Sequence, residues 1–172
     1  MANKLVQGDK FPQIKLNLVD GGVISIPEVK ERYLVLIFYR GTWCPYCKRQ
    51  LASYHAKLAE LRDLGAIVVA GAVDDLASSK ALAADLGLTF PLAYGVTAEQ
   101  VSELNPWWTE DNHGKYIQPM EFLISRGGLV LGSMYASGPV GRMGVDEVLT
   151  AIRNRERRRL EQEKASLGER KV

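Results

Sequence analysis

The chain is poor in cysteine and histidine, with only two of each among its 172 residues. A structural zinc site needs about four nitrogen or sulfur ligands, and both cysteines and both histidines would have to converge to supply them. A disulfide-stapled fold needs several cysteine pairs spread along the chain. The composition therefore argues against a zinc-binding domain and against a disulfide framework.

Long apolar runs and a strong net charge are also missing. No segment approaches the roughly 20 consecutive apolar residues of a membrane span, and the N-terminus carries no apolar stretch of signal-peptide length. The 22 Lys and Arg residues nearly balance 20 Asp and Glu residues, for a net charge of +2. That field is too weak to indicate nucleic acid or a membrane as a partner. We therefore expect a cytoplasmic protein without either partner.

The length and the distribution of charge predict one domain followed by a short extension. A chain of 172 residues fits one domain better than two. From Arg153 onwards, eight Lys and Arg residues stand among four Asp and Glu residues. We interpret such a run as a solvated helix surface rather than a binding site. The expected boundaries are a domain over 1–154 and a charged helical extension over 155–172.

The hydrophobic pattern predicts an α/β fold. Two continuous apolar runs are typical of strands buried on both faces, and Gly-containing turns predict hairpins near both ends of the domain. The predicted strands are 14–18, 23–26, 33–39, 66–73, 90–94, 120–125 and 129–135. The predicted helices follow the cysteines as far as Gly65, cover 76–86 and 97–104, and begin again near Gly144, with 105–116 as a loop insertion. This order predicts a central mixed β-sheet flanked by helices.

The two cysteines lie three residues apart, in Cys44-Pro45-Tyr46-Cys47. Random placement would give this spacing in roughly 1% of chains, so the spacing is itself informative. Such a pair can bind zinc, form a structural disulfide or exchange electrons. Zinc lacks further ligands, and a disulfide that closes so small a loop adds little stability. Redox exchange is the interpretation that remains.

The local pattern around the cysteines also favours redox chemistry. Cys44 follows a buried strand, and Pro45 occupies the expected first position of a helix. Free amides and the helix dipole at that position stabilise an anion, so Cys44 is expected to be a thiolate, and the nearby Arg40 would add to this effect. We expect Cys44 to lie outermost and attack, and Cys47, one turn further along, to be shielded and to resolve the mixed disulfide.

The segment from Gly41 to Lys48 resembles the active site of thioredoxin-fold proteins. Trp43 before the first cysteine is typical of thioredoxins, and Pro45-Tyr46 is the dipeptide of glutaredoxins. Over roughly 5–152, the chain resembles the alkyl hydroperoxide reductase/thiol-specific antioxidant family, the peroxiredoxins and their relatives. The supporting stretches are 8–12, Phe38-Tyr39, 86–92 and 119–124. The resemblance implies a thioredoxin-like fold with an N-terminal β-hairpin.

The chain departs from the peroxiredoxin motif at the positions that activate peroxide. Alignment on Phe38-Tyr39 puts Arg40 at the family's Pro, Cys44 at its Thr and Cys47 at its peroxidatic cysteine. The family's Arg on a later strand falls at Pro119, which instead resembles the cis-proline that lines the thioredoxin substrate groove. Without that Thr and Arg, the resemblance implies slow reaction with peroxide.

The main functional expectation is a thiol–disulfide oxidoreductase with an antioxidant role. Cys44 and Cys47 carry the chemistry, and the support residues are Arg40, Thr42, Trp43, Pro45 and Pro119. Partners would be disulfides of proteins or small thiols, together with a reductant such as thioredoxin, glutaredoxin or glutathione; no cofactor or metal is expected. Two alternatives stay open, namely a thiol-dependent peroxidase using either cysteine, and a redox-regulated binding protein.

Overall fold

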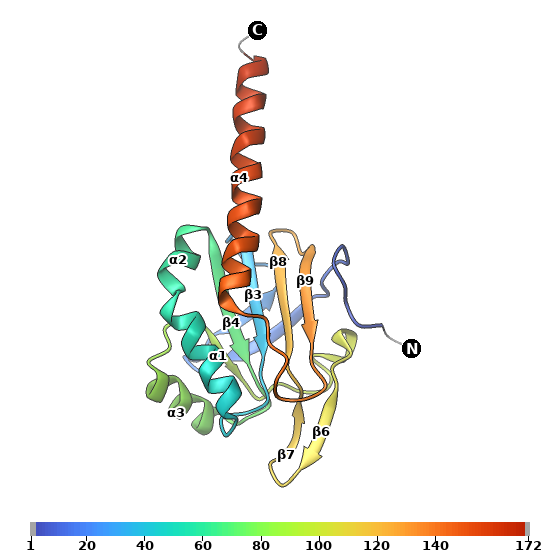
Figure 1. Cartoon of the computed structure of the whole chain (residues 1–172). Helices are drawn as coiled ribbons and strands as arrows, with labels where there is room; N and C mark the ends of the chain where they lie inside the picture. The colour runs from blue at the N-terminus through green and yellow to red at the C-terminus, as the bar shows by residue number, and fades with distance from the viewer. Residues whose placement is uncertain (1–2, 171–172) are drawn as a thin grey trace.

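The computed structural model describes residues 3–170 and places a seven-stranded mixed sheet at the centre (Figure 1). The strands lie in the order β2-β1-β5-β4-β3-β8-β9, and a two-stranded sheet, β6-β7, stands apart. The strands of the large sheet are β1 Ile14–Leu18, β2 Val23–Ile26, β3 Tyr33–Phe38, β4 Ala66–Gly71, β5 Leu92–Tyr94, β8 Met120–Ser125 and β9 Val130–Tyr135. The helices are α1 Pro45–Ala56, α2 Leu58–Asp63, α3 Leu76–Leu86 and α4 Val145–Arg170, with a 3-10 turn η1 at Ser102–Leu104. The predicted thioredoxin-like α/β fold with its N-terminal β1–β2 hairpin is confirmed.

The continuous apolar run of β3 explains its central place. All six of its residues are buried, because one neighbour, β4, runs parallel to it and the other, β8, runs antiparallel. Successive side chains of β3 therefore enter two separate cores on opposite faces of the sheet. Since β3 and β4 are parallel, their carboxyl ends meet at one edge of the sheet, where the cysteine segment begins.

The two faces of the sheet are covered differently. Apolar residues of α1, α2, α3 and α4 share one core with Val35 and Ile37 of β3. The opposite core joins Leu34 and Leu36 of β3 to the N-terminal segment, the β1–β2 hairpin and the η1 turn. The four α-helices thus pack against a single face, and they support the carboxyl end of β3 from that side.

Two expectations between β5 and β8 are wrong. The helix expected over 97–104 is reduced to a turn and η1, although Thr97 and Gln100 cap each other as at a helix start. Asn105, with φ +53°, ends the turn, and Pro106 follows it, so the helix has no room to extend. The loop expected over 105–116 contains a hairpin, β6 Trp108–Asp111 and β7 Gly114–Ile117.

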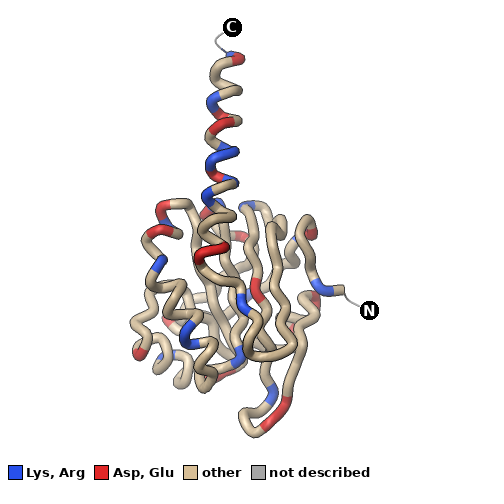
Figure 2. Tube along the Cα trace, in the orientation of Figure 1, with Lys and Arg blue, Asp and Glu red and all other residues tan. Residues whose placement is uncertain are grey.

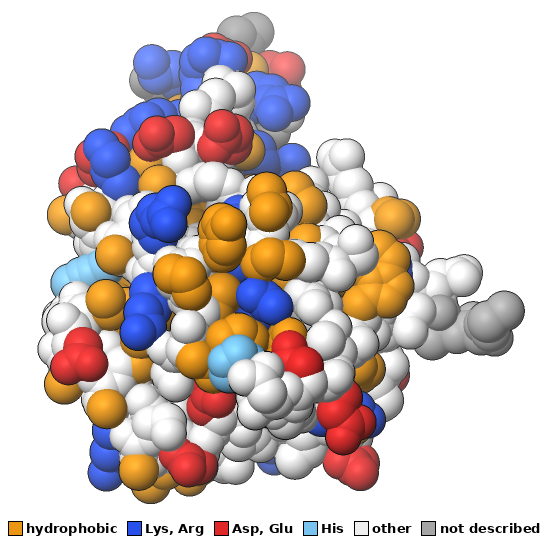
Figure 3. All heavy atoms as spheres, turned by 60° about the horizontal axis from the view of Figure 1, so that its bottom comes forward, with side chains coloured by type: hydrophobic (Ala, Val, Ile, Leu, Met, Phe, Trp, Pro, Cys, Tyr) orange, Lys and Arg blue, Asp and Glu red, His pale blue; other side chains and the backbone are white. Residues whose placement is uncertain are grey.

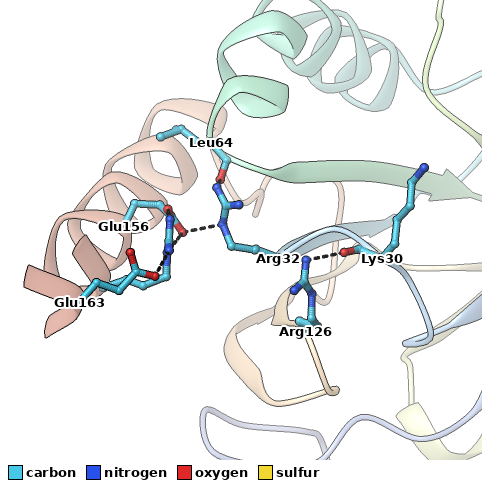
Figure 4. Close-up of polar contacts among 7 residues, drawn as sticks. Lys30, Arg32, Leu64, Arg126, Glu156 and Glu163 are labelled. Carbon is cyan, nitrogen blue, oxygen red and sulfur yellow. Dashed lines mark hydrogen bonds and ion pairs between the residues drawn. The ribbon is translucent and has the colours of Figure 1, made fainter. Parts of the chain in front are cut away.

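Helix α4 leaves the body of the protein and projects beyond it, carrying alternating charges (Figures 1 and 2). At its point of departure, Glu156 is buried and accepts hydrogen bonds from Arg32 at 3.1 Å and Arg159 at 2.8 Å (Figure 4). Residues 160–170 are exposed. The contact of Glu156 with Arg32 means that part of the segment proposed as an extension, 155–172, belongs to the packed domain.

No helix within residues 3–170 combines the length and the apolar character needed to cross a bilayer.

Candidate active site

The cysteine segment forms a tight connection between β3 and α1. A side chain at Gly41 would collide with the indole of Trp43, so glycine is required there. Cys44 has extended backbone angles, φ −90° and ψ 112°, and occupies the N-cap of α1, followed by Pro45 at the first helical position. The Cys44 sulfur accepts a hydrogen bond from the Cys47 amide at 3.3 Å. A sulfur thus takes the place that a Ser or Asp oxygen usually fills at a helix start.

Several hydrogen-bond donors converge on the Cys44 sulfur. Besides the Cys47 amide, Arg40 Nη1 and Arg142 Nη2 each lie 3.7 Å from it. A hydrogen bond from the Cys47 side chain has the largest effect in lowering the pKa of the Cys44 thiol, well below its ordinary 9.0, and it outweighs the opposing effect of burial. The Cys47 amide and the two guanidinium groups act in the same direction. Cys44 is therefore the thiolate of the pair.

Cys47 has the opposite electrostatic character. Burial raises the pKa of its thiol, and so does the hydrogen bond to Cys44. Its sulfur accepts hydrogen bonds from the Arg40 amide at 3.4 Å and from Arg142 Nη2 at 3.3 Å. These donors would stabilise a thiolate on Cys47 once the first sulfur has been oxidised.

Cys44 was expected to lie outermost of the pair, but neither cysteine reaches the surface. Both cysteines are free thiols with an exposed fraction of 0%. The helix start does activate Cys44, but Trp43, Arg40 and Arg142 crowd around its sulfur. A large substrate cannot reach the sulfur in this conformation, whereas a molecule of two or three atoms needs only a small opening.

Arg142 is the important residue that the sequence did not reveal. It lies in the loop between β9 and α4, 95 residues after Cys47, and it contacts both sulfurs. A lone arginine between Gly141 and Met143 carries no motif, so no sequence pattern marks it. It supplies a guanidinium to the site although Pro119 replaces the arginine of the family motif.

The β6–β7 hairpin covers one side of the site with aromatic rings. The rings of Trp43 and His113 stack with their centroids 3.8 Å apart, and Tyr116 meets Trp43 edge-on at 4.8 Å. Arg40 lies over both Trp43 and Tyr116 and donates from Nη2 to the Tyr116 hydroxyl at 3.0 Å. The Tyr116 hydroxyl in turn donates to Asp111 at 2.8 Å. The hairpin thereby fixes the guanidinium that faces Cys44.

Of the other predicted support residues, Thr42 and Pro45 lie in the cysteine segment and Pro119 directly precedes β8. The Thr42 amide donates to the Asp74 carboxylate at 2.7 Å, which ties the cysteine segment to the end of β4. Pro45 begins α1. The cis-proline expected at Pro119 is wrong, because the cis peptide bond within residues 3–170 is Ile26–Pro27. The Pro119 carbonyl accepts from the Ala136 amide at 2.9 Å, directly beyond the paired ends of β8 and β9.

The face that carries this site gathers apolar side chains with basic ones among them (Figure 3). A cavity of about 280 Å³ lies between α1 and the loop before α4. It is lined by Tyr46, Arg49, Gln50, Ser53, Arg142, Met143 and Gly144. Because Arg142 lines this cavity and also contacts both sulfurs, the cavity adjoins the dithiol.

The arrangement can carry out two-electron thiol chemistry. One buried sulfur is held as a thiolate by fixed donors, and a protonated partner lies within hydrogen-bonding reach of it. The same donors would stabilise negative charge on a small group attached to the first sulfur. Within the described range 3–170, no cluster of three or more His, Cys, Asp and Glu side chains is placed to hold a metal ion.

Comparisons with known proteins agree with this fold and with a redox function. The model of the AhpC/TSA family matches residues 7–132. The chain is 25% identical over 149 residues to a Mycobacterium tuberculosis protein provisionally named a peroxiredoxin, covering 83% of this chain and 95% of that protein. It is 30% identical over 92 residues to the chloroplastic peroxiredoxin Q of Triticum aestivum, covering 54% of this chain and 42% of the plant protein.

Solved structures show the same fold. The crystal structure of the peroxidoxin BcpB from Mycobacterium tuberculosis superposes with a TM-score of 0.74 at 16% sequence identity, over 87% of this chain and 97% of that one. The sheet, the cysteine segment at the start of α1 and the family match over most of the domain lead to one conclusion. The chain belongs to the AhpC/TSA family of antioxidant oxidoreductases, the family of the peroxiredoxins.

Proposed function

We propose that the chain is a thiol peroxidase in which Cys44 attacks a hydroperoxide and Cys47 resolves the product. The observation that carries this proposal is the surroundings of the Cys44 sulfur. Three hydrogen-bond donors from the backbone and two arginines lie 3.3 to 3.7 Å from it, and its exposed fraction is 0%. Such a site suits a small substrate that develops negative charge better than it suits a protein disulfide.

The reaction balances with the groups present. The Cys44 thiolate attacks one peroxide oxygen, the O–O bond breaks, and the other oxygen leaves as an alkoxide or hydroxide that takes up a proton. Cys47 then attacks the resulting Cys44 sulfenic acid, so that an S–S bond forms and water leaves. Reduction of this disulfide needs two electrons from an external dithiol such as a thioredoxin-like partner.

The missing Thr and Arg of the family motif do not argue against peroxide as strongly as the sequence suggests. Arg142, from the loop before α4, and Arg40, four residues before Cys44, bring guanidinium donors to the sulfurs. Thiol–disulfide exchange, the main expectation from the sequence, then becomes the second half of the cycle, in which the external reductant regenerates the pair. The low pKa of Cys44 also makes it the better leaving group in that half-reaction.

Stopped-flow mixing of the fully reduced protein with hydrogen peroxide tests the proposal. We expect a rapid reaction that consumes both thiols, whereas Cys47→Ser should accumulate a Cys44 sulfenic acid that a dimedone-type reagent traps. Arg142→Met should slow the first step by about a hundredfold, the usual effect of removing one oxyanion donor. A wild-type rate no greater than that of a free thiolate would refute the peroxidase assignment.

A further inference from the structure

A fully buried carboxylate lies behind the dithiol. Glu121 is the second residue of strand β8, and its exposed fraction is 0%. Its paired neighbours on β3 and β9 are the uncharged Ile37 and Met134. Buried carboxylates are costly unless several hydrogen bonds satisfy them. Neither the fold nor the redox chemistry described so far explains why a strand that otherwise reads as apolar carries Glu at this point.

A chain of hydrogen bonds through Gln50 and Arg142 connects Glu121 to the sulfurs. Its Oε1 accepts from the Met143 amide at 2.5 Å, and its Oε2 accepts from Gln50 Nε2 at 2.6 Å. The other end of the Gln50 amide, Oε1, accepts from Arg142 Nη1 at 3.1 Å. Arg142 Nη2 then reaches Cys47 at 3.3 Å.

We propose that Glu121 is a positioning residue that holds Arg142 on the two sulfurs through the Gln50 side chain and the Met143 amide. The expected effects on peroxide rates rest on the proposed peroxidase function, whereas the expected effect on the Cys44 thiolate does not. The directions of the hydrogen bonds support it. Because both Glu121 oxygens accept, Gln50 must turn its NH2 towards them, and its oxygen is left to anchor the guanidinium.

The ionisation of Glu121 follows from the same contacts. Burial raises its pKa to about 7, although the Met143 amide, Gln50 and Arg142 all favour the charged form. The other titratable group facing it is Tyr54 of α1, whose hydroxyl donates to the Met143 carbonyl at 2.8 Å and which also senses Glu147 of α4. A proton on Glu121 would compete with the Gln50 NH2 and loosen Arg142. The acid limb of the peroxide rate should therefore follow Glu121 instead of Cys44, whose pKa is lower still.

A donor–acceptor swap tests the chain of contacts. In Glu121→Gln, the new NH2 must face either the NH2 of Gln50 or the Met143 amide, so one of the two contacts that hold Arg142 in place becomes a donor facing a donor. The double variant Glu121→Gln/Gln50→Glu reverses the direction of the hydrogen bond between positions 121 and 50 and keeps acceptors for the Met143 amide and for Arg142. It gives up only the 3.4 Å hydrogen bond from Gln50 Nε2 to the Met143 carbonyl. Glu147→Gln is the matched control, because it removes a nearby exposed carboxylate outside the chain of contacts.

The measurements are the peroxide rate against pH and the ultraviolet titration of the Cys44 thiolate. We expect E121Q to lower the rate about tenfold or more, to move the thiolate titration to higher pH and to make the acid limb of the rate coincide with that titration. The double variant should recover most of the rate, and the control should match the wild type. Unchanged behaviour of E121Q, or a loss that the double variant does not restore while circular dichroism shows a native fold, would overturn the role. The titration needs no substrate, so it tests Glu121 even if the peroxidase proposal fails.

Discussion

At the residue scale, the two cysteines show how position alone separates two chemically identical side chains. Both are completely buried, yet the pKa of Cys44 is lowered and that of Cys47 is raised. Cys44 is at the N-cap, where the amide of Cys47 points at its sulfur. Cys47 lies inside the first turn, and its thiol is the donor that stabilises Cys44. The difference in pKa therefore follows from the helix start, which favours a Cys44 thiolate, and from burial, which raises the pKa of Cys47.

The first prediction concerns the roles of the two cysteines. Iodoacetamide at neutral pH should alkylate Cys44 before Cys47 in the reduced protein, because only Cys44 has a large thiolate fraction. Mass spectrometry of peptides from partly alkylated protein would identify the modified residue. Cys44→Ser should lose the peroxide reaction, whereas Cys47→Ser should keep its first step. If Cys47 were alkylated first, the peroxidatic role would instead belong to the position that the family alignment assigns.

The second prediction concerns stability and pH at Glu121. Its pKa is raised from 4.5 to about 7 in the folded state, so the native protein binds a proton more tightly than the unfolded chain does. This contribution to stability is complete below about pH 4.5 and is lost as the pH rises through about 7. The loss amounts to roughly 3 kcal/mol at most, from about 1.36 kcal/mol per pKa unit.

Urea unfolding of the reduced protein between pH 4.5 and 8 would measure this effect, because the range runs from the ordinary pKa of a glutamate to above the raised pKa of Glu121. Glu121→Gln cannot titrate, so its free energy of unfolding should fall less over that range than that of the wild type. Parallel pH profiles for the two proteins would show that Glu121 has an ordinary pKa in the folded state.

Sequence reasoning at this scale found the residues that are close together in the chain. Cys44, Cys47, Trp43 and Arg40 lie within eight residues and share one recognisable motif. Arg142 joins them only through the fold, because β9 and its following loop bring it back over α1. A guanidinium supplied by a loop can be recognised only when the tertiary structure is known.

At the element scale, the β6–β7 hairpin is the part of the site that the sequence did not predict. Its residues are polar and aromatic with weak alternation, so a loop was the natural expectation. The hairpin forms because four residue pairs join its strands around a turn at Gly114, where φ is +86°. Its energetic contribution comes from the contact of His113 and Tyr116 with Trp43, a contact between segments about 70 residues apart.

The third prediction belongs to this hairpin. His113→Ala removes the ring stacked on Trp43 and should loosen the cover over Cys44. We expect alkylation of Cys44 by iodoacetamide to become several-fold faster, because access to the buried sulfur depends on local opening. The ultraviolet titration of the thiolate should not change, since His113 makes no contact with either sulfur among the contacts of residues 3–170. Asp63→Ala, on the exposed side of α2, serves as the control. Equal alkylation rates for all three proteins would mean that the hairpin does not restrict access.

At the scale of the whole molecule, the order of strands and helices was predictable. The buried runs of β3 and β4, the helix stop at Gly87 and the β8–β9 turn each carry a strong local pattern. What the pattern could not provide was the side of the sheet on which each helix packs, or where the chain leaves the domain. Those features depend on contacts between distant residues, as at Arg32 and Glu156.

The last prediction concerns the point near Glu156 where α4 leaves the domain. It uses the fact that this point and the dithiol lie at opposite ends of the sheet. Helix α4 projects from the end of the sheet opposite the β6–β7 hairpin (Figure 1). A chain ending at Gln162 keeps the Glu156 contacts, and the described residues that it loses, 163–170, are all exposed, so its melting temperature should match that of the full chain. A chain ending at Asn154 loses Glu156 and leaves Arg32 without that partner. It should be less stable by roughly 1–2 kcal/mol, a value reduced because Arg32 and Arg159 are each 37% exposed.

Both truncated chains should retain the peroxide rate of the full chain at temperatures where they are folded, because the dithiol lies at the other end of the sheet. Calorimetry and stopped-flow mixing on the same samples would separate stability from activity. Glu156→Gln in the full chain is the control that removes the ion pairs alone. It should reproduce most of the loss of stability expected for the chain that ends at Asn154. If the chain ending at Gln162 were as unstable as the one ending at Asn154, the exposed part of α4 would have to pack on another surface, such as a second copy of the protein.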